Sequence, residues 1–316
     1  MDTILELADE YFFDGVYAKL VPKQVPLANA TTNFLGEQLA TTSAWERDSD
    51  LRICLSLSVF LIVGATLFYF ASATFSYFVF FDKEYMKHPR FLKNQVRLEI
   101  ESATKAIPGF ALLTVPWFWG EIKGYSLLYE GTPATLLEWA YLALTVPLFL
   151  LFTDCGIYWV HRYLHHPLLY KHLHKPHHKW LIPTPYSAYA FHPLDGYFQS
   201  IPYHLFVYIV PMHKWLYMSM FMFVNIWTIL IHDGNFISRS TIINTSAHHA
   251  VHHLYFNYNY GQYFTFWDRF GESHRAPTEE QYDAELRINK KTWAQQAKEA
   301  EEIEGKVLKT SKQKVN

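Results

Sequence analysis

Charged residues are scarce in this chain of 316 residues. They make up 18% of the sequence, whereas ordinary soluble domains carry about 25%. The formal net charge is only −2, so the chain lacks the strongly basic balance of a protein that binds nucleic acid. Half of the residues are hydrophobic and 18% are aromatic. This composition is typical of a protein with large surfaces facing lipid, and we expect no nucleic-acid partner.

Cysteine is almost absent. The two cysteines, Cys54 and Cys155, both lie in apolar runs. A disulfide framework and a zinc ribbon are therefore excluded. Histidine, in contrast, occurs 17 times, and most of its copies are concentrated in two stretches of the chain.

Residues 53–81 contain no charged side chain. A membrane span needs about 20 apolar residues, so this segment predicts a transmembrane helix. Weaker apolar segments follow, and their short lengths leave open whether they are full spans or membrane hairpins. These segments cover residues 106–120, 140–153, 197–212 and 215–231. The chain is thus predicted to be a multi-pass membrane protein.

The side of the membrane on which each loop lies is predicted from charge. Lysine and arginine are frequent in residues 83–105, just after the first predicted span. Positively charged loops stay cytosolic, so the N-terminus is expected on the lumenal side, where Asn29 would be a glycosylation acceptor. An alternative with four full spans and a cytosolic N-terminus remains open.

The predicted fold is all-α: an integral membrane helical bundle with a histidine-rich cytosolic cap that holds a di-metal site. Composition divides the chain into three parts. These are an N-terminal segment 1–50, a membrane domain 51–282 that contains the histidines, and a charged helix and tail 283–316.

Three groups of histidines have helical or near-helical spacing. The first is an HxxxH pair that follows directly on an apolar segment, and the other two are HxxHH groups. Since residues three and four apart share a helix face, each group directs its imidazoles toward one point. The members are His161 and His165, then His174, His177 and His178, then His249, His252 and His253.

This many imidazoles in one place predict a metal site. Neighbouring imidazoles repel one another once any of them is protonated, whereas coordination gives each lone pair to a cation. Zinc takes four ligands at most in structural sites, so eight or nine histidines suit two metals with open positions. Copper also accepts imidazole, and a pH sensor is a further alternative. Two irons that activate dioxygen are the simplest hypothesis for a site beside an apolar substrate.

Further residues are candidates for this site. His232 ends an apolar segment and is a ninth candidate ligand. Ligand imidazoles usually give their second N–H to a carboxylate or a carbonyl, and Asp154, Asp195 and Asp233 are the carboxylates at hand. The roles of other histidines beside the groups stay open: His166, His172, His192 and His248.

Four longer motifs extend the pattern beyond the histidines. They are YWVHRYLHHPLLYKHLHKPHHKW, PTPYSAYAFHPLDGYFQSIPYH, VNIWTILIHDG and HHLYFNYNYGQYFTFWDRFG. Together they resemble the sterol C-5 desaturases, especially the fungal ones, within the fatty acid hydroxylase/sterol desaturase superfamily. The resemblance covers residues 152–271 most closely.

The resemblance implies an O2-dependent oxidoreductase of the endoplasmic reticulum membrane, with two non-haem irons held by the histidine groups on the cytosolic side. It implies removal of two hydrogens from C-5 and C-6 of a Δ7 sterol, such as episterol on the route to ergosterol. It also implies electrons from NAD(P)H through cytochrome b5 and its reductase. The sequence contains no His-Pro-Gly-Gly haem motif, so the haem protein is expected to be a separate partner.

Two other functions remain open on the sequence. A hydroxylase or methyl oxidase of the same superfamily, acting on fatty acyl, sphingoid or C-4 methyl sterol substrates, would use the same histidines. A metal transporter or sensor would also bind metal. However, transporters place ionisable groups inside their spans, whereas these histidines lie near the ends of apolar segments.

Overall fold

The computed structural model describes residues 2–26, 39–236, 238–287 and 289–313. The candidate glycosylation site Asn29 lies outside these residues. The chain divides into two compact units, one formed by residues 1–64 and 111–126, the other by residues 65–110 and 127–316. Helices α3 (Asp50–Val79) and α4 (Gln95–Ile122) contribute to both units.

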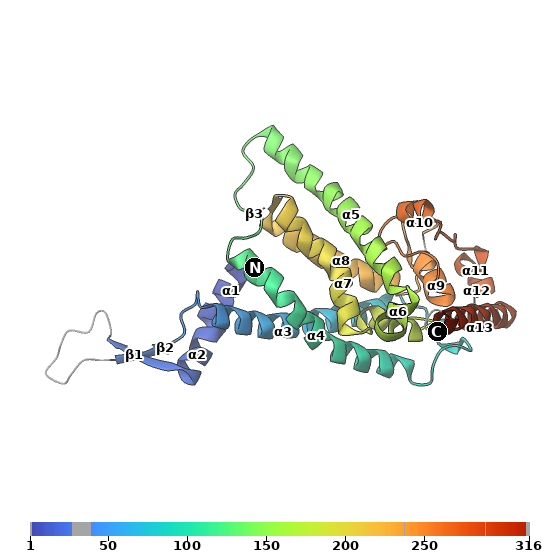
Figure 1. The fold of residues 1–316 in the computed structure, drawn as a ribbon, viewed down its shortest axis with the longest axis horizontal. Coiled ribbons are helices and arrows are strands. Elements are labelled where there is room, and N and C mark those ends of the chain that lie inside the picture. The colour runs from blue at the N-terminus through green and yellow to red at the C-terminus, as the bar shows by residue number, and fades with distance from the viewer. Residues whose placement is uncertain (1, 27–38, 237, 288, 314–316) are drawn as a thin grey trace. The chain divides into compact units, whose positions relative to one another are not determined.

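The first unit contains the N-terminal helices and a small sheet (Figure 1). Its helices before α3 are α1 (Asp2–Ala8), the π-helical turn η1 (Asp9–Phe13) and α2 (Asp14–Leu20). The sheet pairs β1 (Pro22–Pro26) with β2 (Leu39–Ser43) in antiparallel register, Pro22 opposite Ser43.

The second unit holds all nine candidate metal ligands and is mostly helical among its described residues. Its long helices are α5 (Leu136–Leu164), α7 (Pro193–Ile209), α8 (Lys214–Ile231), α9 (Ser246–Tyr255) and α13 (Lys290–Gln313). Its shorter elements are η2 (Lys83–Lys87), α6 (Pro167–Leu169), η3 (Tyr170–His174), η4 (His177–Lys179), η5 (Pro185–Tyr189), α10 (Phe266–Phe270), α11 (Glu279–Tyr282) and α12 (Ala284–Arg287). Two short strands, β3 (Leu128–Tyr129) and β4 (Met212–His213), pair in parallel.

Helix α5 brings the first histidine pair to the site, and its packing against α7 fixes its position. It begins with a capping box, in which Thr135 and Glu138 satisfy each other's backbone amides. A Cβ added at Gly156 would lie 2.7 Å from the ring of Pro202 on α7, so only glycine permits this approach. The same two helices also meet through the ring of Phe149 on α5 and the ring of Phe206 on α7. These rings pack edge to face with their centroids 5.2 Å apart.

Three helices of the described part of the chain are long and apolar enough to cross a membrane. They are α3, α5 and α8. A mostly helical membrane protein was predicted, and this is confirmed. Helix α4 begins at Gln95, well before the apolar segment that predicted it, because it includes a polar first half with the buried Glu99. The number of spans and the side of the N-terminus stay predictions.

Candidate metal centre

All nine predicted ligands come together in the second unit, in two groups of buried or half-buried imidazoles. Group 1 consists of His161, His165, His174, His178 and His252, and group 2 consists of His177, His232, His249 and His253. Within each group the possible ligand atoms all lie within 4.8 Å of one another. Both groups combine histidines from motifs far apart in the sequence.

Local structure explains how each group forms. His161 lies in the last turn of α5, and His165 follows as the residue that caps that helix. Helix α5 stops before Pro167, as predicted, and the chain continues through the short turns η3 and η4, which contain the second motif. His232 caps the C-terminus of α8, and the third motif lies on α9, which has His252 in group 1 and His253 in group 2.

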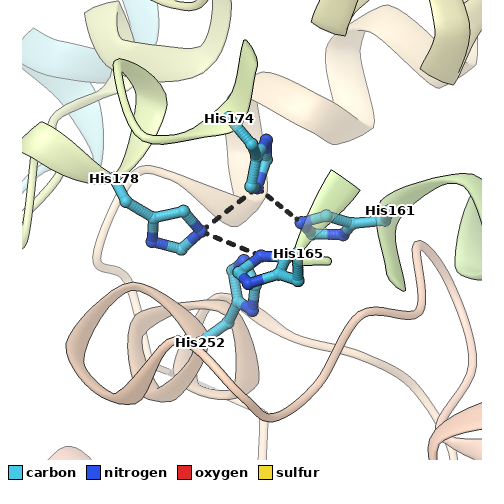
Figure 2. Close-up of side chains that lie close together, drawn as sticks. All are labelled: His161, His165, His174, His178 and His252. Atoms are coloured by element: carbon cyan, nitrogen blue, oxygen red, sulfur yellow. Dashed lines mark hydrogen bonds between the residues drawn. The ribbon is translucent and has the colours of Figure 1, made fainter. Parts of the chain in front are cut away.

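In group 1 the Nε2 atoms face one another (Figure 2). The Nε2 of His174 lies 3.0 Å from that of His161 and 3.1 Å from that of His178. The Nε2 of His178 lies 3.2 Å from that of His165. Group 2 has the same form, since His249 Nε2 lies 2.9 Å from His232 Nε2 and 3.1 Å from His253 Nε2.

The other ring nitrogens indicate which nitrogen of each ring carries the proton. His161 Nδ1 lies 3.0 Å from the carbonyl oxygen of Tyr260, and His174 Nδ1 lies 2.7 Å from the carboxylate of Asp195. Because carbonyls and carboxylates accept hydrogen bonds, each Nδ1 carries the proton, and the neutral ring has a bare lone pair on Nε2. Two such lone pairs then face each other at 3.0 Å. A shared metal ion turns this repulsion into coordination.

Two further rings repeat this arrangement. His232 Nδ1 donates to the carbonyl of Thr228 at 2.6 Å, and His252 Nδ1 donates to that of Tyr258 at 2.7 Å. The Nε2 of His252 is buried and has no hydrogen-bond partner among the described residues. A buried polar nitrogen of this kind is rare unless something absent from the protein chain binds it. The residues therefore fit a metal centre.

The spacing of the nitrogens also bears on the kind of metal. With metal–nitrogen bonds of about 2.1 Å, ligands at right angles have nitrogens about 3.0 Å apart, and tetrahedral ligands about 3.4 Å apart. The contacts of group 1 measure 3.0 to 3.2 Å. In group 2, His232 Nε2 lies 3.4 Å from His177 Nε2, so spacing alone does not select one geometry, but group 1 offers one imidazole more than the four ligands of tetrahedral zinc.

Burial favours the neutral form of several of these imidazoles. Desolvation lowers the pKa of His232 to about 4 and that of His252 to about 3. Desolvation, with smaller contributions from the neighbouring histidines, lowers the pKa of His177 and His249 well below the usual value. At pH 7 the rings are therefore ready to donate lone pairs to a metal.

Of the three predicted carboxylate partners, Asp195 contacts a ligand imidazole. Its Oδ2 accepts from His174, and its Oδ1 accepts from the side chain of Gln199 at 2.7 Å. Asp154 instead accepts from the backbone amides of Tyr263 and Phe264, and Asp233 accepts from the amide of Asn235. Backbone carbonyls serve several of the other rings, and a main-chain oxygen leaves no signature in the sequence.

The histidines whose roles stayed open have other surroundings. His166 and His192 cap the N-termini of α6 and α7 by accepting from backbone amides. His248 forms a capping box with Thr245 at the start of α9 and stacks on His274 at 5.8 Å. His172 is exposed. Sequence spacing alone did not distinguish these helix-capping histidines from ligands.

Comparisons with known proteins agree with the motifs. Residues 146–273 match the family model described as fatty acid hydroxylase. The chain is 46% identical to a "Probable Delta(7)-sterol 5(6)-desaturase" of Neurospora crassa, over 96% of this chain and 94% of that protein. It is also 46% identical to a "Delta(7)-sterol 5(6)-desaturase" of Eremothecium gossypii, over 96% of both chains. No solved structure matches the chain.

The chain therefore belongs to the fatty acid hydroxylase family, the class of membrane oxidoreductase that its helices and histidines suggest. Within that family it falls among proteins named as sterol desaturases: a further relative, from Gibberella zeae, has this name and is 48% identical over 89% of this chain and 91% of its own length. The predicted resemblance is confirmed.

One prediction concerns Asp195. In Asp195→Asn the side chain still accepts from His174, but the negative charge that strengthens this hydrogen bond is lost. Because partners of ligand imidazoles typically contribute 10- to 100-fold to metal affinity or activity, we expect a loss of about 10-fold in both. Metal content after dialysis and the rate of substrate conversion measure it. Asp233→Asn, a buried carboxylate that binds a backbone amide, is the control and should change metal content less than about two-fold.

Proposed function

We propose that this protein is a sterol C-5 desaturase, which removes two hydrogens from C-5 and C-6 of a Δ7 sterol in ergosterol biosynthesis. The observation that supports it most is the identity of 46% with a named sterol desaturase over 96% of both chains. The nine clustered imidazoles supply a site for the oxidative step. An acid–base mechanism is unsuited to this reaction, because an unactivated ring C–H is not acidic enough for a side-chain base.

The two histidine groups are proposed to hold two non-haem irons. Zinc has no redox chemistry, and group 1 offers five imidazoles where zinc uses four ligands. When bound, such irons would convert dioxygen into an oxidant strong enough to break C–H bonds. The protein's own part is to fix nine ring nitrogens, to shield them from water by burial and to orient the sterol.

The position of the groups suits a sterol that stays in the bilayer. His161 lies in the last turn of α5 and His232 caps α8, and both helices are candidate spans. If α5 and α8 cross the bilayer, the proposed metal centre lies at the level where these spans leave the hydrocarbon. A sterol places its 3-hydroxyl at the membrane–water interface, and C-5 and C-6 lie only a few bonds from that hydroxyl. The reacting carbons thus lie near the depth of the histidines.

We further propose that the histidine side faces the cytosol at the endoplasmic reticulum membrane. Electrons would come from NAD(P)H through cytochrome b5 and its reductase, since the chain contains no haem-binding motif of its own. The lysines and arginines in residues 83–105 support a cytosolic position for that part of the second unit.

Sterol profiling tests the proposed reaction. The protein is expressed in fungal cells that lack sterol C-5 desaturase, and sterols are analysed by mass spectrometry. We expect Δ7 sterols to decrease and Δ5,7 sterols to appear. Accumulation of a hydroxylated or C-4 demethylated product would favour the superfamily alternatives, and an unchanged sterol profile with normal protein levels would contradict the proposal.

A further inference from the structure

The segment Tyr258–Phe264 between α9 and α10 contacts group 1 through main-chain carbonyls and through the ring of Tyr260, whose centroid lies 4.8 Å from that of His165. The carbonyl of Tyr258 accepts from His252 Nδ1, and the carbonyl of Tyr260 accepts from His161 Nδ1. These two imidazoles come from different helices, α9 and α5. One short segment thus fixes the ring orientation of two group 1 histidines.

Two buried carboxylates hold this segment in place. Asp268, on α10, accepts from the amides of Tyr260 and Gly261, both at 2.8 Å. Asp154, on α5, accepts from the amides of Tyr263 at 2.7 Å and Phe264 at 3.2 Å. Both carboxylates are at most 1% exposed. Four backbone amides of the segment therefore have carboxylate acceptors, and hydrogen bonds to charged groups are among the strong ones.

The rest of the segment is also fixed. Asn259 has a positive φ of 56° and is 1% exposed, and its side chain donates to the carbonyls of His248 and Arg275. A Cβ added at Gly261 would lie 2.6 Å from the carbonyl oxygen of Phe264, so the backbone turns too tightly for another residue. The segment is therefore a rigid support and not a loose loop.

We propose that Asp154 and Asp268 are positioning residues that set the geometry of the group 1 metal through this segment. The proposal rests on the proposed metal centre. Moving the carbonyls of Tyr258 and Tyr260 would rotate the rings of His161 and His252, and both rings belong to group 1. Neither of these two rings belongs to group 2. Loss of either carboxylate should therefore weaken metal binding at the group 1 site and not at the group 2 site.

Binding of Co²⁺ to the apo-protein tests this asymmetry without any need for activity. The visible absorption of Co²⁺ reports its coordination, and the wild-type chain is expected to bind two ions. In Asp268→Asn a side-chain NH2 group replaces one of the two carboxylate oxygens that accept from the amides of Tyr260 and Gly261. Two N–H donors then face each other, and one hydrogen bond is lost. We expect one site to lose about 10-fold in affinity, the magnitude typical of outer partners, while the other changes less than about two-fold. Asp154→Asn should weaken the same site.

Asp283→Asn is the matched control, since Asp283 Oδ1 also accepts from two backbone amides, those of Glu285 and Leu286. It should leave both Co²⁺ sites unchanged. Equal weakening of both sites in Asp268→Asn and Asp154→Asn, or no weakening, would overturn the inference. A wild-type chain that binds no Co²⁺ would overturn the proposed metal centre itself, and this inference with it. Helical circular dichroism verifies that each variant is folded.

A second observation, in the first unit, concerns the N-terminal helices. Several large apolar side chains on α1, η1 and α2 are exposed: Leu7 by 50%, Tyr11 by 81%, Phe12 by 60% and Leu20 by 71%. Four large exposed apolar side chains within a segment of about twenty residues indicate a surface that another molecule covers.

These helices are attached to the first turns of the candidate span α3. Tyr17 Oη lies 3.1 Å from Ser56 Oγ, and Arg52 donates to Asp9 at 2.7 Å and also to Asp14. Arg52 is only 3% exposed, and its charge is balanced by these two carboxylates. Ser56 lies six residues beyond Asp50, which is about 9 Å along the helix.

Helix α3 also exposes apolar side chains on one face. Leu51, Leu55 and Val59 are 54%, 42% and 48% exposed and lie one turn apart on one face. If α3 crosses the bilayer, this face contacts lipid, and the attached helices lie beside it at the depth of the headgroups. We infer that α1, η1 and α2 form an interfacial element whose exposed apolar side chains insert into the lipid surface.

Depth-dependent quenching of a fluorescent label tests this second inference. Single cysteines replace Tyr11, Val59 or Lys23 in a chain with Cys54 and Cys155 replaced by serine, reconstituted in phosphatidylcholine vesicles. Val59 on α3 is the lipid reference, and the exposed Lys23 on β1 is the aqueous reference. We expect brominated lipid to quench the Tyr11→Cys label at least about half as strongly as the Val59→Cys label. Quenching by aqueous iodide equal to that of Lys23→Cys, or protection from both quenchers by a second copy of the chain, would overturn it.

Discussion

Replacement of His177 with alanine is expected to abolish sterol desaturation while the protein still accumulates in membranes. His177 is buried in group 2, where its Nε2 lies 3.4 Å from that of His232. Partners of ligands typically contribute 10- to 100-fold, so the loss of a ligand in a four-histidine group should exceed about 100-fold. Conversion of Δ7 sterol in microsomes, normalised to protein amount, measures the effect.

His172→Ala is the matched control for this substitution. His172 lies only five residues away in the turn η3, but its side chain is exposed and belongs to neither group. This variant should retain activity within about two-fold, as surface substitutions usually do. Comparable losses in both variants would show that the fold of this region, and not the ligand, determines the effect.

Removal of metal is expected to eliminate activity, and only iron should restore it. A chelator applied to the detergent-solubilised protein would leave nine buried or half-buried imidazoles without a cation, and the lone pairs of His161 and His174 would face each other, an unfavourable arrangement. Added Fe²⁺ should bind at about two ions per chain and restore conversion, whereas Zn²⁺ should bind without restoring it, because zinc has no redox chemistry. Iron analysis and conversion assays on the same samples measure both quantities.

The same experiment has a readout in stability. A ligand that binds only the folded state at 100 times its dissociation constant stabilises that state by about 2.7 kcal/mol. Both Fe²⁺ and Zn²⁺ should therefore raise the melting temperature of the apo-protein, although only one restores activity. Full activity of a protein that contains zinc and no iron would contradict the proposed cofactor.

The helices and the histidine groups were predictable from the sequence because both depend on local spacing. The uncharged run at residues 53–81 predicted α3, and Pro167 marked the end of α5. The spacing in the three motifs and the position of His232 predicted the nine histidines that come together. Their assignment as iron ligands stays a prediction that the experiments above test.

The division into groups of five and four was not predictable. It places His174 and His178 in one group and His177, between them in sequence, in the other. This depends on how two short turns are folded against α9, and spacing along one helix carries no such information. Asp154 was expected beside a histidine because it lies two turns before His161, but it reaches the backbone of Tyr263 instead. Which group a carboxylate contacts thus depends on the packing of segments that are distant in the sequence.

The wide separation of the ligands along the chain has a consequence for how the protein is made. Group 1 extends from His161 to His252 and group 2 from His177 to His253, so group 1 is complete only after residue 252, and group 2 only after residue 253, has been synthesised. Candidate span α8 must also be in place, because His232 caps its end. Neither proposed metal site can therefore be loaded before these late segments are made and folded. If the groups hold iron as proposed, a cell short of iron would accumulate inactive protein.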